Sequence, residues 1–303
     1  MSKIIVIGSV SMDLVMETDR IALEGETVFG NRFSMFPGGK GANQAVAIGR
    51  LSQPEDEIIM LGAVGQDSFG SILLENLREN HIFVDNVGTV PQFSGIAQIT
   101  LYQDDNRIIY CPGANGEVNP DSWTDEWKAF ENADLVVLQN EIPHQANVAI
   151  AKFCKEQGIK ILYNPAPARS TDMEMLDWVD YFTPNEHECQ ELFPERELED
   201  LLNDYPEKLI VTLGTRGSIY SDGHQVHHIP ALKTQPVDTT GAGDTFNGAF
   251  GYALSHGISV FEALRFATLA AHLSVQKFGA QGGMPTMKEM KESSYYEKTW
   301  DFE

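Results

Sequence analysis

The stretch PVDTTGAGDTFNGAF (residues 236–250) decides the fold assignment, because it sets three residues with little or no side chain before an aspartate and an apolar, helix-like run. Glycine loses much backbone entropy when it is ordered, so Gly241 and Gly243 begin a helix poorly. They suit a place where a ligand must approach the backbone, since the first N–H groups of a helix are unpaired and attract anions. The stretch predicts an anion site at Gly241, Ala242 and Gly243, with Asp244 beside it.

Outward from this stretch, apolar runs of strand length recur along the chain. They are KIIVIG (3–8), EIIMLGAVG (57–65), ADLVVLQNE (133–141), KILYNPAP (160–167) and KLIVTLG (208–214). Continuous apolar runs indicate strands buried on both faces, and amphipathic segments between them indicate βαβ units. These segments are 41–51, 68–79, 144–157 and 186–193, and the pair 243–256 and 259–276 follows them. We expect one α/β domain over 1–303, with three layers and helices on both faces of a mostly parallel central sheet.

Two stretches break this alternation, at about 14–36 and 93–110. Both alternate apolar and polar residues with a period of two, which is typical of half-buried strands. We expect a small antiparallel β lid inserted into the α/β domain. Its apolar face requires cover, either by a bound substrate or by a second subunit.

Composition excludes several classes of partner. The chain has 303 residues, 44 acidic against 21 basic side chains and a net charge of −23. Binding to nucleic acid or to an anionic membrane needs a basic surface, so neither is expected. Three cysteines without C-x-x-C spacing favour a reducing compartment, and no apolar run approaches the ~18 residues of a membrane span. We therefore expect a soluble, cytoplasmic protein.

Polar residues follow several of the predicted strands. In open α/β sheets ligands bind at the carboxyl ends of the strands, where these side chains should meet. The residues are Ser11, Asp13, Gln139, Asn140, Glu141, Asn164 and Asn185, together with the loop TLGTRG (212–217).

The stretch PGGKGANQAVAIGRL (37–51) places Lys40 among glycines at a helix start, with Asn43 one turn in. Taken alone it fits an ordinary turn, although a lysine and an asparagine there also suit a grip on sugar hydroxyls or phosphate oxygens. Asp244 has two interpretations as well. It complements the helix dipole, or it accepts a hydroxyl proton in phosphoryl transfer, which needs positioning, charge stabilisation and a base.

Two blocks, PGGKGANQA (37–45) and DTTGAGDTFNGAF (238–250), resemble the paired signatures of the ribokinase family of sugar kinases. The segments NPAPAR (164–169), TPNEHE (183–188) and TLGTRG (212–217) resemble that family in order and spacing. The resemblance runs from GSVSMD to GAQGGMP and covers nearly the whole chain.

The resemblance implies roles for individual residues. Asp244 would be the base that takes the proton from the primary hydroxyl of the sugar, and the backbone of 241–243 would form the anion hole. The positions that would hold the sugar are Ser11, Asp13, Gly39, Lys40, Asn43, Glu141 and Asp244.

The resemblance also implies sites for ATP and for Mg²⁺. Asn185 and Glu188 match an N-x-x-E element, and Glu188 would support the magnesium ion. The positions that would bind the nucleotide are Asn185, Thr212, Gly214, Thr215, Gly217, Gly243 and Thr268.

Members of the family use a monovalent cation, typically K⁺, beside the anion hole. Its ligands would be Asp238 and the main-chain carbonyls of Thr240, Ser274, Lys277 and Gly279. A fixed cation there would hold the loop that precedes Asp244.

The chain departs from the family pattern at three positions. Ser11 stands where an asparagine usually precedes the sugar-binding aspartate, Gly283 replaces a serine among the cation ligands, and Thr268 replaces His or Asn near the adenine. Serine reaches less far than asparagine, so 2-deoxyribose or another pentose becomes an alternative substrate.

The resemblance therefore implies an ATP-dependent kinase that phosphorylates the 5-hydroxyl of D-ribose with Mg²⁺ and K⁺. The lid would pair with that of a second subunit to give a homodimer. The alternatives are a kinase for 2-deoxyribose, fructose or a nucleoside, and a sugar-binding regulator without catalysis.

Overall fold

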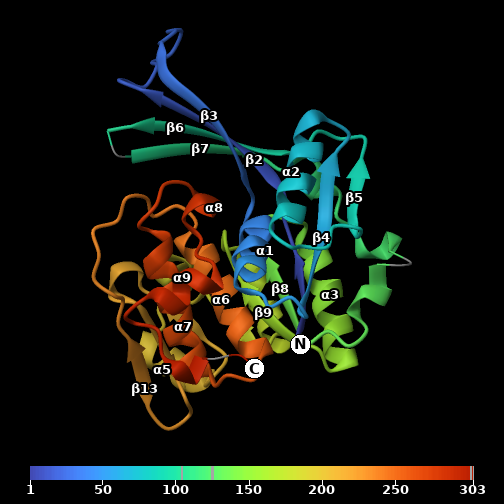
Figure 1. Ribbon diagram of the computed structural model, residues 1–303, viewed down its shortest axis with the longest axis vertical. Helices are drawn as coiled ribbons and strands as arrows, with labels where there is room; N and C mark the ends of the chain where they lie inside the picture. The colour runs from blue at the N-terminus through green and yellow to red at the C-terminus, as the bar shows by residue number, and fades with distance from the viewer. Residues whose placement is uncertain (104, 124–125, 301, 303) are drawn as a thin grey trace.

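The computed structural model describes residues 1–103, 105–123, 126–300 and 302 (Figure 1). Its centre is a parallel six-stranded sheet in the order β10-β9-β8-β1-β4-β5. The strands are β1 (Lys3–Ile7), β4 (Glu57–Gly65), β5 (Val87–Val90), β8 (Leu135–Gln139), β9 (Lys160–Asn164) and β10 (Tyr181–Phe182). Residues Ile4 to Ile7 of β1 have no exposed surface, as the continuous apolar run predicts.

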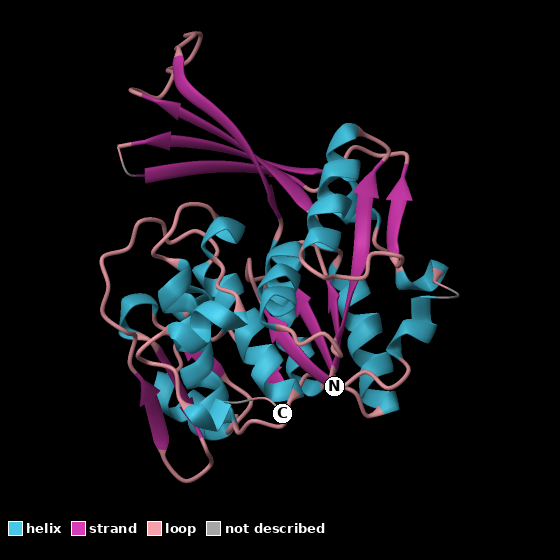
Figure 2. Cartoon of the chain, in the orientation of Figure 1, coloured by secondary structure: helices cyan, strands magenta, loops and turns pink. Residues whose placement is uncertain are grey.

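Helices cover both faces of this sheet (Figure 2). Alternate residues of each strand enter separate cores: Ile4 and Val6 of β1 pack in one, Ile5 and Ile7 in the other. The first core contains α1 (Lys40–Leu51), α2 (Ser68–Glu79), α6 (Ala242–Ser255), α7 (Val260–Ser274), α8 (Ala280–Gly283) and α9 (Met287–Glu292). The second contains α3 (His144–Gln157), α4 (Glu186–Leu192) and α5 (Leu198–Asp204). The predicted three-layer α/β fold is confirmed.

The run predicted at 208–214 forms the shorter strand β11 (Ile210–Thr212), which lies beside β10. Only isolated bridges, Phe182 with Leu209 and Asn185 with Thr212, connect it to the parallel sheet. Its continuous ladder is antiparallel, to β12 (Ser218–Ser221), which pairs in turn with β13 (Val226–Ile229). The chain reverses at 214–217, so β11 pairs with the segment that follows it.

The lid consists of β2 (Ser11–Thr18), β3 (Gly30–Gly38), β6 (Gly95–Tyr102) and β7 (Asp105–Cys111), in the order β3-β2-β6-β7. It projects from the α/β body, with its strands at the top of the view (Figure 1). The two outer pairs are antiparallel, as expected, and the central pair β2–β6 is parallel. A parallel centre follows from the chain path, because β2 and β6 both leave the same edge of the central sheet.

The two faces of the lid differ. One faces a cleft of about 790 Å³ between the lid and the 236–240 and 278–280 loops, and Val15, Phe36 and Ile99 line it. The opposite face exposes large apolar side chains that the described residues leave partly uncovered: Met16 (39%), Phe33 (57%), Met35 (50%) and Ile109 (65%). Elsewhere in the described residues, every helix is too short or too polar to cross a bilayer.

Candidate active site

Asp244 lies in the first turn of α6, directly above the carboxyl edge of the central sheet, and is 8% exposed. Its Oδ2 accepts a hydrogen bond from Asn43 Nδ2 at 2.9 Å, and its Oδ1 accepts one from Gln44 Nε2 at 3.2 Å. Both donors belong to α1, so the two blocks of the sequence meet at this carboxylate. Burial raises the pKa of Asp244, and the charge of Lys40 and the two amide donors oppose that shift.

Further amides hold these two donors in place. Gln281 Nε2 donates to Asn43 Oδ1 at 3.0 Å, which turns the amide nitrogen of Asn43 toward Asp244. Gln44 Nε2 also lies 3.2 Å from Asn164 Oδ1, and its Oε1 accepts from Gln139 Nε2 at 2.7 Å. The sequence motifs contain Gln44 and Gln281, but nothing in the pattern distinguishes them from helix residues; only the tertiary contacts identify their part.

Lys40 is the positive group among four carboxylates of the site. Burial alone would lower the pKa of Lys40, but the nearby charges of Asp244, Glu141, Glu188 and Asp13 outweigh burial and raise it. The carboxylates disfavour one another's ionisation. Burial, followed by Glu141 and Asp244, raises the pKa of Asp13 to about 7. The sequence predicted these residues as one site, and the structure gathers them.

The glycine before α1 allows the start of this helix to touch the segment that follows β1. Gly39 has φ +89°, and a Cβ there would lie 2.9 Å from backbone atoms of Ser9 and Ser11. This contact brings the amide of Lys40 to Glu141, whose Oε2 accepts from it at 2.9 Å and from Ser9 Oγ at 2.5 Å.

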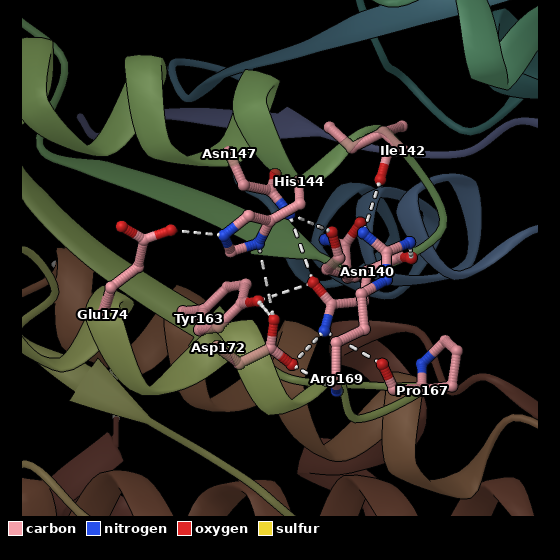
Figure 3. A network of polar contacts seen from close by, with 10 residues as sticks. Asn140, Ile142, His144, Asn147, Tyr163, Pro167, Arg169, Asp172 and Glu174 are labelled. Atoms are coloured by element: carbon pink, nitrogen blue, oxygen red, sulfur yellow. Dashed lines mark hydrogen bonds and ion pairs between the residues drawn. The ribbon is translucent and has the colours of Figure 1, made fainter. Parts of the chain in front are cut away.

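The segment that carries Glu141 is fixed by a buried polar network (Figure 3). The Arg169 guanidinium donates to the carbonyls of Asn140 and Ile142, on either side of Glu141. Asp172, which is fully buried, accepts from Asn140 Nδ2 at 2.5 Å and from the Tyr163 hydroxyl at 2.9 Å. Arg169, the last residue of the NPAPAR segment, therefore supports the predicted sugar-site residue Glu141 from outside, while Asn164 at the start of the segment contacts Gln44 beside Asp244.

Ser11 is buried at the base of β2, and its hydroxyl has neighbours that sequence reasoning missed. Asn115 Nδ2 donates to Ser11 Oγ and to the Tyr110 hydroxyl, both at 3.0 Å. Asn115 is itself held, since its Oδ1 accepts from the Val10 amide at 2.9 Å. Tyr110 comes from lid strand β7, and period-two alternation alone gave no reason to place it in the site.

The predicted anion hole is the start of α6. Gly241 has φ +76°, and a Cβ there would lie 2.8 Å from the Ala280 Cα. The N–H of Ala242 donates to the Thr239 carbonyl at 3.2 Å. Within the described residues, no acceptor pairs with the N–H groups of Gly241 and Gly243, and the space beside Gly243 is open. The Asp244 N–H likewise has no acceptor among the described residues, so the N–H groups of Gly241, Gly243 and Asp244 are available to a phosphoryl group.

Asn185 and Glu188 form a capping box at the start of α4. Glu188 Oε2 accepts from the Asn185 amide at 2.8 Å, and Asn185 Oδ1 accepts from the Glu188 amide at 2.9 Å. Among the described residues, no group of three or more His, Cys, Asp or Glu side chains could hold a metal ion. Glu188 therefore fits a supporting part, because Mg²⁺ usually keeps several waters and binds through few carboxylates together with phosphates.

The predicted nucleotide loop follows β11. Asn185 bridges to Thr212, so the capping box and this loop lie side by side. Gly217 has φ +96°, and a Cβ there would lie 2.0 Å from the Ile229 carbonyl oxygen. Gly214 and Thr215 belong to the tight turn between Thr212 and Gly217. Thr268, in α7, lines a separate cavity of about 360 Å³ together with Ile229, Pro230 and Leu232.

The residues predicted to bind a monovalent cation come from two loops that Asp238 joins. Its Oδ1 accepts from the Thr240 amide at 2.9 Å and its Oδ2 from the Gly279 amide at 2.8 Å. Gly283 lies against Ser274, where a Cβ would be 2.1 Å from the Ser274 carbonyl oxygen. A serine at 283 would therefore collide with this backbone. Lys277 belongs to the same turn, since its amide points to that carbonyl at 3.5 Å.

A buried, amide-held carboxylate at a helix start with free N–H groups, facing one lysine, defines an α/β enzyme of the phosphotransferase class. The chain belongs to the pfkB family of carbohydrate kinases, whose family model matches residues 1–287. It is therefore a kinase with an alcohol group as acceptor.

Similar proteins agree with this assignment. The chain is 61% identical to a ribokinase of Lactococcus lactis subsp. lactis, over 96% of each chain. It is 46% identical to a ribokinase of Bacillus subtilis, over 96% of this chain and 99% of the relative. A solved structure of Arabidopsis thaliana ribokinase complexed with ribose and ATP has a TM-score of 0.86 and 33% identity, covering 95% of this chain and 97% of that one.

Proposed function

We propose that this chain transfers the γ-phosphoryl group of ATP to the 5-hydroxyl of D-ribose, giving ribose 5-phosphate and ADP. The observation that carries the proposal is the Asp244 carboxylate, fixed by Asn43 and Gln44 of the block predicted to hold the sugar. The ribose and ATP of the Arabidopsis ribokinase structure, and the ribokinases similar along the whole chain, support the same substrates.

The Asp244 carboxylate takes the proton of the sugar hydroxyl. At the same time the hydroxyl oxygen bonds to the γ-phosphorus of ATP, and the bond between this phosphorus and the ADP oxygen breaks. Asn43 and Gln44 keep both carboxylate oxygens in place during this transfer. The N–H groups of Gly241 and Gly243 bind the equatorial oxygens of the moving phosphoryl group, on which negative charge develops. Asp13, Gly39, Lys40 and Glu141 hold the sugar.

Two metal ions belong to the proposal. Glu188 and Asn185 would support Mg²⁺, which would neutralise the phosphate charge when bound. The segments that Asp238 joins, with Thr240 and Gly279, would hold K⁺, whose charge would steady the backbone before Asp244. The Gly279 carbonyl already accepts from the Gly283 amide at 3.0 Å, so one lone pair remains for a cation.

The proposal extends to assembly and location. A single domain over 1–303 carries the lid, and the exposed apolar face with Met16, Phe33, Met35 and Ile109 pairs with the lid of a second copy. The three cysteines, Cys111, Cys154 and Cys189, are free thiols, which suits the reducing cytoplasm.

A kinetic screen of ribose, 2-deoxyribose, fructose and adenosine tests the substrate. We expect the highest kcat/KM for ribose, and equal or better turnover of another acceptor would contradict the assignment. Replacing K⁺ by Na⁺ or by a bulky organic cation in the same assay tests the cation site, and an unchanged rate and affinity would remove it. Absence of any phosphorylation would leave a sugar-binding regulator.

The second candidate is a 2-deoxyribose kinase, which the short side chain of Ser11 favours. The same screen decides between them, because a 2-deoxyribose kinase turns over ribose no faster than 2-deoxyribose.

A further inference from the structure

Four side chains form one row across the inner face of the lid. Asp13 pairs directly with Phe36 on one side and with Ala97 on the other, and Ala97 pairs with Tyr110. Directly paired residues of neighbouring strands point to the same face. Because β6 lies between β2 and β7, the Asp13 and Tyr110 positions are about 10 Å apart, two strand spacings. Ala97, which has a small side chain, therefore lies between the Asp13 carboxylate and the Tyr110 phenol in this row.

The Tyr110 hydroxyl reaches from this row to the base of β2. Asn115 Nδ2 lies 3.0 Å from both the Tyr110 hydroxyl and Ser11 Oγ, and it donates one hydrogen to each. Both hydroxyl oxygens thus act as acceptors toward Asn115, and each keeps its own hydrogen. If one of the two hydroxyls donates its hydrogen to the other, the hydrogen of the second hydroxyl is still free to be donated. The pair therefore has at least one hydrogen that it can donate to a ligand beside Ser11.

The charges around Tyr110 agree with this position. Burial raises the pKa of Tyr110 to about 12, and the carboxylates of Glu141 and Asp13 add to the shift. Both carboxylates belong to the predicted sugar site, so the phenol lies within their field. The phenol stays protonated at neutral pH and can donate.

We propose that Tyr110 is a specificity-determining residue of the sugar site, whose hydroxyl binds a ring hydroxyl of the pentose beside Ser11. Serine ends one carbon from the backbone, and the Tyr110 phenol supplies the reach that Ser11 lacks. This inference rests on the proposed function, since it names how the same site selects its sugar. Tyr110 discriminates ribose from a deoxypentose, because a buried hydroxyl left without its partner weakens binding of the deoxy sugar.

The test compares Tyr110→Phe with the wild-type protein on ribose, 2-deoxyribose and 3-deoxyribose. Phenylalanine keeps the ring and removes only the hydroxyl. We expect kcat/KM for ribose to fall about 10-fold, the value of one good hydrogen bond. For the deoxypentose that lacks the contacted hydroxyl, kcat/KM should change less than about twofold, so the preference for ribose over that sugar shrinks about 10-fold. Tyr205→Phe, beside Phe193 in the α5 region, is the matched control and leaves all three values unchanged.

A uniform loss on all three sugars, or no loss on ribose, overturns the inference. Calorimetric dissociation constants for the same sugars separate a lost contact from a damaged fold, because only a lost contact changes their ratio. The proposed function fails separately: it fails if the wild-type protein does not phosphorylate ribose, whatever Tyr110→Phe does. Wild-type turnover of ribose with an unchanged ribose-to-deoxyribose ratio in Tyr110→Phe overturns only the inference about Tyr110.

Discussion

The pocket around Asp244 and the lid are built on opposite plans. In the pocket, side-chain amides of Asn43, Gln44 and Gln281 are buried and bonded to one another or to the carboxylate. In the lid, large apolar side chains such as Phe33 and Ile109 are more than half exposed, and one face of the sheet lines a cleft. At the cleft, the rings of Phe36 and Phe278 lie 6.0 Å apart between centroids.

The contrast separates two tasks. Proton abstraction needs a carboxylate fixed to within a fraction of an ångström, and a network of amides around a rigid helix start provides that order before the substrate binds. The proposed sugar capture and subunit pairing need surfaces that are covered only on binding, and the exposed faces of the lid fit that need. Damage to the pocket should therefore reduce the rate, and damage to the lid should change affinity or assembly.

The largest effect is expected from Asp244→Asn. Asparagine fills the same space but cannot accept the hydroxyl proton, so kcat should fall at least ~10²-fold, while ribose and ATP still bind. Steady-state kinetics and calorimetry on the same preparation measure both quantities. Asp85→Asn, at an exposed acid outside the site, serves as the control for loss of one charge. A variant with a near-normal rate would exclude Asp244 as the base.

Local patterns predicted the frame of this pocket well. The helices expected at 68–79 and 144–157 have the same bounds in α2 and α3. Asp67 caps the first, accepting from the Gly70 amide, and the left-handed Gly158 ends the second. Such signals act within a few residues, so the sequence alone carries them. Four strands of the central sheet, β1, β4, β8 and β9, were also predicted, because burial on both faces leaves an unbroken apolar run. The short edge strands β5 and β10 carry no such run and were not predicted.

The parts that the sequence did not predict depend on contacts between distant segments. Gln281 lies far along the chain from Asn43, and no periodicity links them. Tyr110 reads as an ordinary strand residue until the pairing register of β6 and β7 places it opposite Ala97. The N–H of Ala242 was expected to be free, yet it donates to the carbonyl of Thr239, three residues earlier in the chain. This bond closes the turn before α6.

Gln281→Leu should give the next largest effect. It tests whether an amide that contacts Asn43, and not Asp244 itself, affects catalysis. Without the Gln281 donor, the Asn43 amide is free to rotate, and Asp244 loses part of the hydrogen bonding that lowers its pKa. We expect kcat to fall about 10-fold. The acid limb of the pH profile of kcat/KM should move to higher pH, since Asp244 is deprotonated over a narrower range.

A variant of the neighbouring residue calibrates this result. Asn76 Nδ2 donates to Gln281 Oε1 at 2.8 Å and does not touch Asn43 or Asp244. Asn76→Leu should therefore lower the rate less than Gln281→Leu and leave the acid limb in place. An unmoved limb in Gln281→Leu would show that Gln281 only packs.

Phe33→Glu turns to the lid and should change assembly more than chemistry. A charge in the exposed apolar face opposes its pairing with a second copy, so the protein should elute as a monomer in size-exclusion chromatography with light scattering. The KM for the sugar should rise while kcat changes less. Phe83→Glu, at an equally exposed phenylalanine outside the lid (54% against 57%), should leave the oligomeric state unchanged. A wild-type monomer would contradict pairing through this face.

The smallest effect is expected from Asp13→Asn, at the junction of lid and pocket. The pKa of Asp13 is about 7 in the folded chain against 3.8 for an unperturbed group, so between these values the folded state binds a proton that the unfolded state has released. The free energy of unfolding contributed by Asp13 therefore falls as pH rises from about 4 to about 7.

Asparagine at position 13 removes this loss of stability. The Tm of Asp13→Asn should exceed that of the wild-type protein by several degrees at pH 8, with a smaller difference toward pH 4. The KM for ribose should rise, because the sugar loses a carboxylate partner. A Tm difference that does not grow with pH would mean that burial and the neighbouring carboxylates do not raise the pKa of Asp13 in the folded chain.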